Sequence, residues 1–114
     1  MKYLCLIYSD ERRIETMPRA EVEAVMRDCE AVVGTLRTNG KLIAANRLKP
    51  TASATTIRFE NGKPSITDGP FAETKEQLGG FWLIDAKDLD EALSIASRLP
   101  PARLGCVEVR PISE

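Results

Sequence analysis

The chain has 114 residues, the length of one domain that buries about two thirds of its unfolded surface. Hydrophobic residues make up 43% and charged residues 29%, a balance that excludes a globally disordered chain. The 16 basic and 17 acidic residues leave a net charge of −1, which argues against direct nucleic-acid binding. No apolar run approaches the ~20 residues of a membrane span and no signal peptide opens the chain, so we expect a cytoplasmic protein.

The sequence contains no histidine. A Ser-His-Asp or Cys-His catalytic pair within one chain is therefore excluded. Its cysteines, Cys5, Cys29 and Cys106, lack the close spacing of zinc ligands, and their odd number indicates free thiols in a reducing compartment. Cys5 and Cys106 are expected to be neighbours if the first and last strands pair. We predict neither a metal nor a cofactor, so any acid–base chemistry falls to Asp, Glu, Lys, Tyr or Cys.

The beginning of the chain predicts a strand, a helix and a second strand. Residues 2–8 are almost continuously apolar and rich in β-formers, which indicates a strand buried on both faces. Residues 9–15 are expected to form a charged loop, and a helix follows over 17–38 with Thr16 as its N-cap. Residues 41–48 form the second strand. The apolar face of the helix has a 3.6-residue period and comprises Val22, Val25, Met26, Cys29, Val32, Val33 and Leu36.

The middle of the chain predicts a hairpin and a long loop. Residues 54–60 alternate between apolar and polar side chains, and Asn61-Gly62 is typical of a tight hairpin turn. The returning strand covers 63–67, where Pro64 near the start suits the edge of a sheet. A loop that carries a motif then spans 68–80.

The end of the chain predicts another strand, helix and strand. Residues 81–84 are apolar on both faces, as 2–8 are. Asp88 starts a helix, since Asp88 and Glu91 have the spacing of a capping box, and Pro100-Pro101 stops it. Residues 105–112 alternate and form the last strand. The buried face of the helix is expected to comprise Leu89, Ala92, Leu93, Ile95, Ala96 and Leu99.

The element order predicts one α+β domain over residues 1–114. Two split β-α-β units in this order match a ferredoxin-like β-α-β-β-α-β sandwich, here with an inserted β-hairpin. In that topology the first and third core strands are central and the other two lie at the edges. The pattern agrees, because 2–8 and 81–84 are apolar on both faces whereas 105–112 alternates.

The predicted sheet has one face without helices. The two predicted helices cover only one side, and the other side carries large apolar side chains from residues 2–8 and 81–84. An exposed apolar patch of that size is unusual for a monomer. We therefore expect a homodimer that packs through this sheet face. The alternative is a monomer in which loops 9–16 and 68–80 fold over the sheet.

Residues 68–76 read Asp-Gly-Pro-Phe-Ala-Glu-Thr-Lys-Glu. The first three residues form a turn, because Asp bonds its own backbone, Gly accepts positive φ and Pro sets the next φ. A purely structural interpretation gives Asp68 a capping role, lets Phe71 fill a gap in the core, and leaves Glu73, Lys75 and Glu76 solvated.

This string carries a resemblance. The chain resembles the YCII-related family, in the branch named for DGPFAETKE, and the resemblance extends to residues 1–8, 55–58, 77–84 and 107–111. The resemblance implies a dimeric α/β-barrel of ferredoxin-like subunits. It also implies a His–Asp pair like that of small isomerases and lactone-processing enzymes. Asp68 matches the aspartate, but the histidine has no counterpart here. Genes of this branch often lie beside extracytoplasmic-function sigma factors, which implies a regulatory partner.

The first functional hypothesis is a small-molecule-binding protein or an isomerase- or lactonase-like enzyme with its pocket in the dimer. Asp68 is the expected catalytic acid or base, and the reaction class is proton abstraction next to a carbonyl. Lys75 or Arg58 would hold an anionic group, and Tyr8 would donate a proton or orient the substrate. The expected substrate-binding residues are Tyr8, Arg58, Phe71, Glu73 and Lys75.

Other hypotheses remain open. An interaction protein would use the motif loop or the hairpin at 54–67 to contact a polypeptide such as a sigma factor. A third hypothesis is structural, with Glu73, Lys75 and Glu76 in salt bridges across the dimer. A weaker alternative lets Asp68, Glu73 and Glu76 ligate Mg²⁺ or Ca²⁺.

Overall fold

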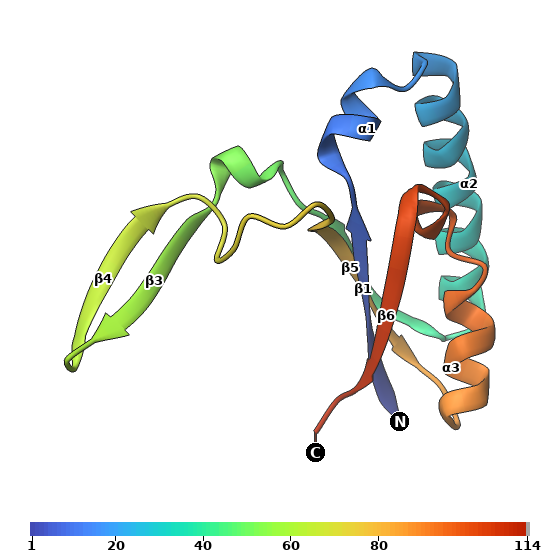
Figure 1. Cartoon of the computed structure of the whole chain (residues 1–114). Helices are drawn as coiled ribbons and strands as arrows, with labels where there is room; N and C mark the ends of the chain where they lie inside the picture. The colour runs from blue at the N-terminus through green and yellow to red at the C-terminus, as the bar shows by residue number, and fades with distance from the viewer. Residues whose placement is uncertain (114) are drawn as a thin grey trace.

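The structure is a computed structural model that describes residues 1–113. Figure 1 shows a sheet with helices on one side and a separate β-hairpin that projects from the other side. Within residues 1–113, no helix is both long enough and apolar enough to cross a bilayer. In chain order the elements are β1 (Lys2–Ser9), α1 (Glu11–Thr16), α2 (Arg19–Thr38), β2 (Leu42–Arg47), the 3-10 turn η1 (Thr51–Ser53), β3 (Thr55–Glu60), β4 (Lys63–Asp68), β5 (Gln77–Asp85), α3 (Leu89–Ala96), the 3-10 turn η2 (Pro100–Leu104) and β6 (Gly105–Pro111).

The main sheet has four strands in the order β2-β5-β1-β6, and every neighbouring pair is antiparallel. The first and third core strands are therefore central, and the α+β fold with its inserted hairpin is confirmed. Strands β3 and β4 pair only with each other and form a second, two-stranded sheet. The hairpin is thus an addition to the four-stranded unit and does not extend its sheet.

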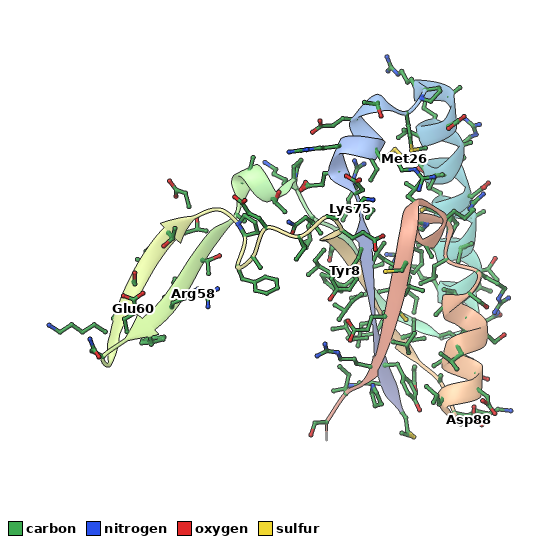
Figure 2. All side chains as sticks on the ribbon, in the orientation of Figure 1. Tyr8, Met26, Arg58, Glu60, Lys75 and Asp88 are labelled. Atoms are coloured by element: carbon green, nitrogen blue, oxygen red, sulfur yellow. The ribbon has the colours of Figure 1, made fainter. Side chains whose placement is uncertain are left out.

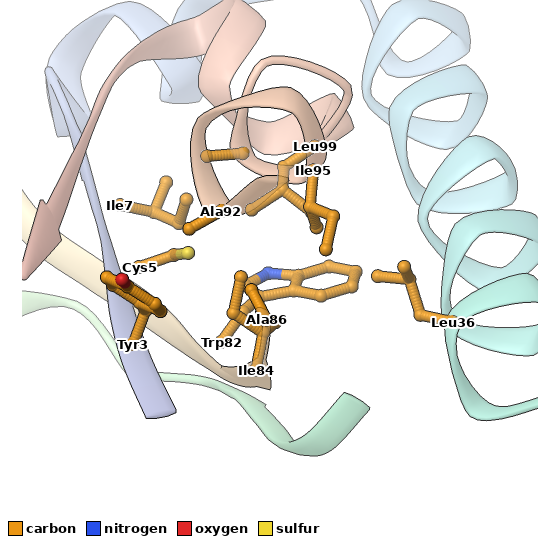
Figure 3. Close-up of a cluster of buried hydrophobic side chains, with 11 residues drawn as sticks. Tyr3, Cys5, Ile7, Leu36, Trp82, Ile84, Ala86, Ala92, Ile95 and Leu99 are labelled. Carbon is orange, nitrogen blue, oxygen red and sulfur yellow. The ribbon is translucent and has the colours of Figure 1, made fainter. Parts of the chain in front are cut away.

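The core lies between the sheet and helices α2 and α3. Residues that alternate along the central strands, such as Tyr3, Cys5 and Ile7, point to this side and are almost fully buried. Trp82 of β5 pairs with Cys5, and Figure 3 shows its indole extending toward Leu36 of α2. Burying a side chain of this kind contributes roughly 1.5–3 kcal/mol. The buried cluster comprises Tyr3, Cys5, Ile7, Leu36, Trp82, Ile84, Ala86, Ala92, Ile95, Ala96 and Leu99.

Most of the segment predicted as a charged loop over 9–15 is helical, since α1 begins at Glu11, so that prediction is wrong. Asp10 is the N-cap of α1, and its carboxylate accepts a hydrogen bond from the Arg12 N–H at 3.0 Å. Thr16 does not cap α2, because it ends α1 and its hydroxyl donates to backbone oxygens one turn earlier. Pro18 occupies the N-cap position of α2. A side-chain cap therefore starts the short helix, whereas the long helix begins without one.

The start of α3 follows the predicted cap with one difference. The Glu91 N–H donates to Asp88 Oδ1 at 2.9 Å, which confirms Asp88 as the N-cap. The reciprocal bond of a capping box is displaced by one residue, because Glu91 Oε1 accepts from the Lys87 N–H at 3.1 Å. The same oxygen accepts from Lys41 Nζ at 2.8 Å and so connects α3 to the start of β2.

The junction between η2 and β6 allows no side chain at Gly105. A Cβ there would overlap the Tyr8 carbonyl oxygen and lie 2.9 Å from Ser9 Cα. Both neighbours are backbone atoms of β1, so β6 must move away from its partner. We expect Gly105→Ala to lower the free energy of unfolding by about 1–3 kcal/mol.

Urea unfolding followed by circular dichroism measures this change. Gly34→Ala is the matched control, because Gly34 lies within α2 and its Cβ would meet nothing within 4 Å. Alanine there should raise stability by roughly 0.5–1 kcal/mol. Equal stabilities of the two variants would contradict the close approach of β6 to β1.

Candidate functional site

The motif begins at the last residue of β4 and is held against β3. Gly69 adopts a φ of 106°, which a residue with a side chain rarely takes. Its N–H donates to the Ala54 carbonyl at 2.7 Å, and its carbonyl accepts from the Thr56 hydroxyl at 2.8 Å. These bonds fix the turn at the base of the hairpin and set the position of Asp68. Asp68 pairs with Thr55, but its side chain is exposed.

The rest of the motif loop is fixed through its backbone. A guanidinium nitrogen of Arg58 donates to the Phe71 carbonyl at 2.7 Å, which ties the loop to β3. The Gln77 amide donates to the carbonyls of Ala72 and Thr74 at 3.3 and 3.0 Å. Arg58 therefore positions the loop, and Figure 2 shows it on the hairpin, whereas Tyr8 lies on the central strand.

The side chains of the motif face open surface. Phe71 is 71% exposed, so the interpretation that it fills a gap in the core is wrong for the single chain. Asp68, Glu73 and Lys75 are also exposed, and they make no ion pair among residues 1–113. No group of three metal-ligating side chains occurs within residues 1–113, so the structure does not bring Asp68, Glu73 and Glu76 together in a cation site. The loop is ordered by its backbone while its functional groups stay available.

The face of the sheet that points away from the helices remains uncovered. Across β1 and β5, Leu4 pairs with Leu83 and Leu6 pairs with Phe81. These residues alternate with the buried core residues and are only half-buried. We call this surface the open face and define it by Leu4, Leu6, Tyr8, Phe81 and Leu83 together with Cys106, Glu108 and Arg110 of β6.

A short polar chain crosses the open face. The Tyr8 hydroxyl donates to Glu108 Oε1 at 3.2 Å, and Arg110 Nε donates to Glu108 Oε2 at 2.6 Å. The Arg110 hydrogen bond is the main cause that lowers the pKa of Glu108. Burial is the main cause that raises the pKa of Tyr8, and the bond to Glu108 adds to it. At neutral pH these three side chains therefore present a phenol, a carboxylate and a guanidinium on the open face.

A cavity of about 490 Å³ lies on the other side of the sheet, between α1, α2 and the strands. Its walls are apolar, and Met26 of α2 is 48% exposed there although the helical pattern predicts it as buried. Among the strand positions that line it, Ser9 and Ala45 carry small side chains and Gly80 carries none, which leaves space beneath the helix. The apolar lining comprises Ile7, Ile14, Val22, Val25, Met26, Cys29, Ala45, Leu48, Pro50, Leu78, Trp82, Pro101 and Leu104, and the charged lining comprises Glu11, Glu15, Glu30, Arg47 and Lys49.

The cavity contains none of the site residues predicted from the sequence. Its lining was detectable only as the apolar face of the helix, which normally indicates core. The sequence signal that could have indicated the cavity is this apolar helix face together with the small residues Ala45 and Gly80 on the opposing strands. Glu11 adds a second feature that sequence reasoning missed. Its carboxylate accepts from the backbone N–H and the hydroxyl of Thr51, which joins α1 to η1 beside the cavity.

The cysteines are chemically separate. β1 and β6 pair as predicted, but Cys5 lies opposite Val109 while Cys106 lies opposite Tyr8. Cys5 points into the core, where burial raises the pKa of its thiol to about 11, and Cys106 is exposed. The prediction that Cys5 and Cys106 are neighbours is therefore wrong, because they belong to opposite faces of the sheet.

Comparison with known proteins supplies the family. Residues 1–114 match the YCII-related domain. The chain belongs to the YCII-related family. An uncharacterized protein of Rhizobium meliloti (strain 1021) is 47% identical over 115 residues, covering 99% of this chain and 93% of the relative.

A solved structure is also similar to this YCII-related protein. It is 5-chloro-2-hydroxyhydroquinone dehydrochlorinase (TftG) from Burkholderia phenoliruptrix AC1100, in complex with 2,5-dihydroxybenzoquinone. The match has a TM-score of 0.48 and 15% identity, and it covers 99% of this chain and 94% of that chain.

The polar chain on the open face predicts an unusual tyrosine titration. We expect the pKa of Tyr8 to lie above the ordinary value near 10, and Glu108→Gln to lower it by removing the negative charge beside the phenol. NMR of ¹³Cζ-labelled tyrosine between pH 8 and 12 measures Tyr8 separately from Tyr3. A Tyr8 titration that is the same in both proteins would contradict the hydrogen bond.

Proposed function

We propose that this YCII-related protein is a homodimer that packs through the open face. The observation that carries the proposal is the uncovered row of Leu4, Leu6, Phe81 and Leu83 on a sheet whose other face is covered by α2 and α3. A surface with such a row of apolar side chains usually meets a partner. Neither the motif loop nor α1 covers it, because the loop faces open surface and α1 lines the cavity on the helix side.

The shape of the single chain supports the same proposal. Its radius of gyration is 15.9 Å, whereas a compact domain of this length has about 13 Å. The hairpin accounts for the difference, since it projects on the side of the open face (Figure 1). An isolated two-stranded hairpin is marginally stable in water, yet Ile57, Phe59 and Ile66 on one of its faces are 57%, 75% and 69% exposed. A second copy packed beneath the hairpin would cover these side chains.

The dimer site is proposed to bind a small molecule. Closing the open face removes the polar chain from water, and a buried phenol, carboxylate and guanidinium favour a polar ligand over plain apolar packing. Tyr8 orients the ligand through its hydroxyl oxygen, which can accept a hydrogen bond while its proton goes to Glu108. The motif loop contributes Phe71, Glu73 and Lys75 from the border of the interface. Asp68 is the carboxylate free to exchange a proton, because Glu108 is occupied by Arg110. The supported reaction class is proton abstraction next to a carbonyl, as in an isomerase that acts on an oxo acid or a lactone.

A second candidate function uses the hairpin as a docking element for another polypeptide. Its support is the exposure of three apolar side chains on the hairpin, since nothing in the single chain covers Ile57, Phe59 or Ile66. Under this hypothesis a regulatory partner such as a sigma factor occupies the place that we assign to the second copy. The mass of the assembly distinguishes the two candidates.

A charged substitution in the middle of the open face tests the dimer. Leu6 lies on the open face directly opposite Glu108, so Leu6→Lys places a cation beside a carboxylate and keeps the single chain folded. Sedimentation equilibrium at micromolar concentration should give a dimer for the wild type and a monomer for Leu6→Lys. Leu93→Lys is the matched control and should remain a dimer, because Leu93 is 47% exposed on α3, although the helical period wrongly predicts it as buried. A monomeric wild type would overturn the proposal.

The role of Asp68 is tested by isotope exchange. In D₂O the wild type should incorporate deuterium next to the carbonyl of a substrate within a panel of 2-oxo acids and lactones, detected by proton NMR. Asp68→Asn should slow this exchange ~10²–10⁴-fold, the usual contribution of a general base. Glu76→Gln makes the same change of charge on the same loop and should have no effect. Exchange that survives Asp68→Asn, or a wild type that exchanges no member of the panel, would exclude the proposed role.

A further inference from the structure

We propose that the hairpin of β3 and β4 is an arm that clasps the second copy of the chain, and that this clasp holds the motif loop in place. By arm we mean residues 55–68, and by motif loop residues 69–76. The clasp rests on the proposed dimer and deepens it, because the order of the candidate site then depends on the partner subunit.

The two faces of the arm differ in chemistry. Ile57 lies opposite Ile66 and Phe59 lies opposite Pro64, and opposite residues of an antiparallel pair share a face. Asp68 lies on the same face at the base of the arm. The arm is therefore an amphipathic ribbon. Its other face is polar and comprises Thr56, Arg58, Glu60, Lys63, Ser65 and Thr67.

Burial on the arm runs against this chemistry. Ile57, Phe59 and Ile66 on the apolar face are all exposed, whereas Thr56 and Ser65 on the polar face are half-buried. An isolated hairpin with a cluster of exposed apolar side chains is marginally stable in water. Since no part of residues 1–113 covers it, the apolar face is a surface for another molecule.

The second copy is the partner that the shape of the chain favours. The chain measures 47 by 41 Å in two directions and 19 Å in the third, and Figure 1 shows the arm standing off the body on the side of the open face. Two sheets packed face to face lie about 10 Å apart, whereas the six residues of β3 span about 20 Å. The arm is therefore long enough to pass the sheet of a second copy and grip its rim. In a two-fold dimer the same contact is made twice.

The polar face of the arm carries the motif loop. The Thr56 hydroxyl donates to the Gly69 carbonyl at 2.8 Å, and an Arg58 guanidinium nitrogen donates to the Phe71 carbonyl at 2.7 Å. The Gly69 N–H donates to the Ala54 carbonyl at 2.7 Å at the base of the arm. Both side-chain donors lie on the polar face. One face therefore holds the loop, and the other stays free for the second copy.

Order in the motif loop follows from order in the arm. Gln77 donates to the carbonyls of Ala72 and Thr74 and so anchors the second half of the loop to β5. The first half is held by Arg58 through the Phe71 carbonyl. A clasp that immobilises the arm fixes this guanidinium, and with it the turn that follows β4. Arg58 is thus a positioning residue for the candidate site.

NMR order parameters from ¹⁵N relaxation measure this order at single amides. In the wild-type dimer, the amides of Ile57 and Phe71 should have values near ~0.85, the level of rigid backbone. In the Leu6→Lys monomer both values should fall below ~0.6. Ile95, which is buried in α3 on the helix side of the sheet, is the internal control and should stay rigid in both proteins.

Polar substitutions on the apolar face test the clasp itself. Phe59→Ser combined with Ile66→Ser should raise the Kd of the dimer ~100-fold in sedimentation equilibrium, because a two-fold dimer loses each contact twice. Leu93→Ser is the matched control, since it removes an exposed apolar side chain from α3 and should leave the Kd unchanged. A rigid Ile95 amide in both variants shows that the body of the chain remains folded.

Arg58→Ala tests the link between the arm and the loop. This variant should remain a dimer with a rigid Ile57 amide, while the order parameter of the Phe71 amide falls below ~0.6. Arg58→Lys keeps a cationic donor and should restore most of that order. Lys63→Ala removes a cation from the same face and should change neither amide, because the bond to the Phe71 carbonyl comes from Arg58.

The outcomes separate the clasp from the dimer. A monomeric wild type would overturn both. A wild-type dimer whose arm is as mobile as that of Leu6→Lys would overturn the clasp alone and favour the hairpin as a docking element for another polypeptide. An unchanged Kd in the Phe59 and Ile66 double variant would exclude the apolar face from the interface. A rigid Phe71 amide in Arg58→Ala would exclude the link to the motif loop.

Discussion

The pairing of β1 along both of its edges is the constraint on which the other features depend. Because β5 and β6 both bond to β1, successive side chains of one strand are divided between two environments. Tyr3, Cys5 and Ile7 enter the core under the helices, while Leu4 and Leu6 remain on the open face. The same alternation separates the helix-side cavity from the polar chain that begins at Tyr8. The cavity and the polar chain are thus placed on opposite faces of the sheet by the period of a single strand.

Most of the fold was predictable because each element carries a strong local pattern. The alternation of 105–112, the helical period from Val22 to Leu36 and the Asp88 cap all have direct physical causes, and the strand order follows from which strands are apolar on both faces. The six-residue helix α1 was not predictable, since so short a helix has no measurable period. It is held by the Asp10 cap and by the distant contact of Glu11 with Thr51, and sequence patterns do not reveal such a contact.

The candidate sites were less accessible to sequence reasoning. The motif could be located, but its sequence does not tell that Arg58 bonds the Phe71 backbone or that the loop side chains remain exposed. The cavity was hidden for a different reason. An apolar helix face predicts burial, and whether that burial is by protein or by a ligand depends on the size of side chains across the gap, here Ala45 and Gly80. The volume of the cavity depends on the side chains of both the helix and the facing strands, so the pattern of the helix alone cannot predict it.

The pairing of β1 with β6 also sets the order of events at the ribosome. Tyr3 is synthesised long before Pro111, its partner in β6, so the two cannot pair until the intervening chain has emerged. Until then one edge of the most apolar strand has no backbone partner, and such an edge is prone to join another chain. Truncation of this protein at its C-terminal end should expose that edge permanently and favour aggregation over a merely weakened fold.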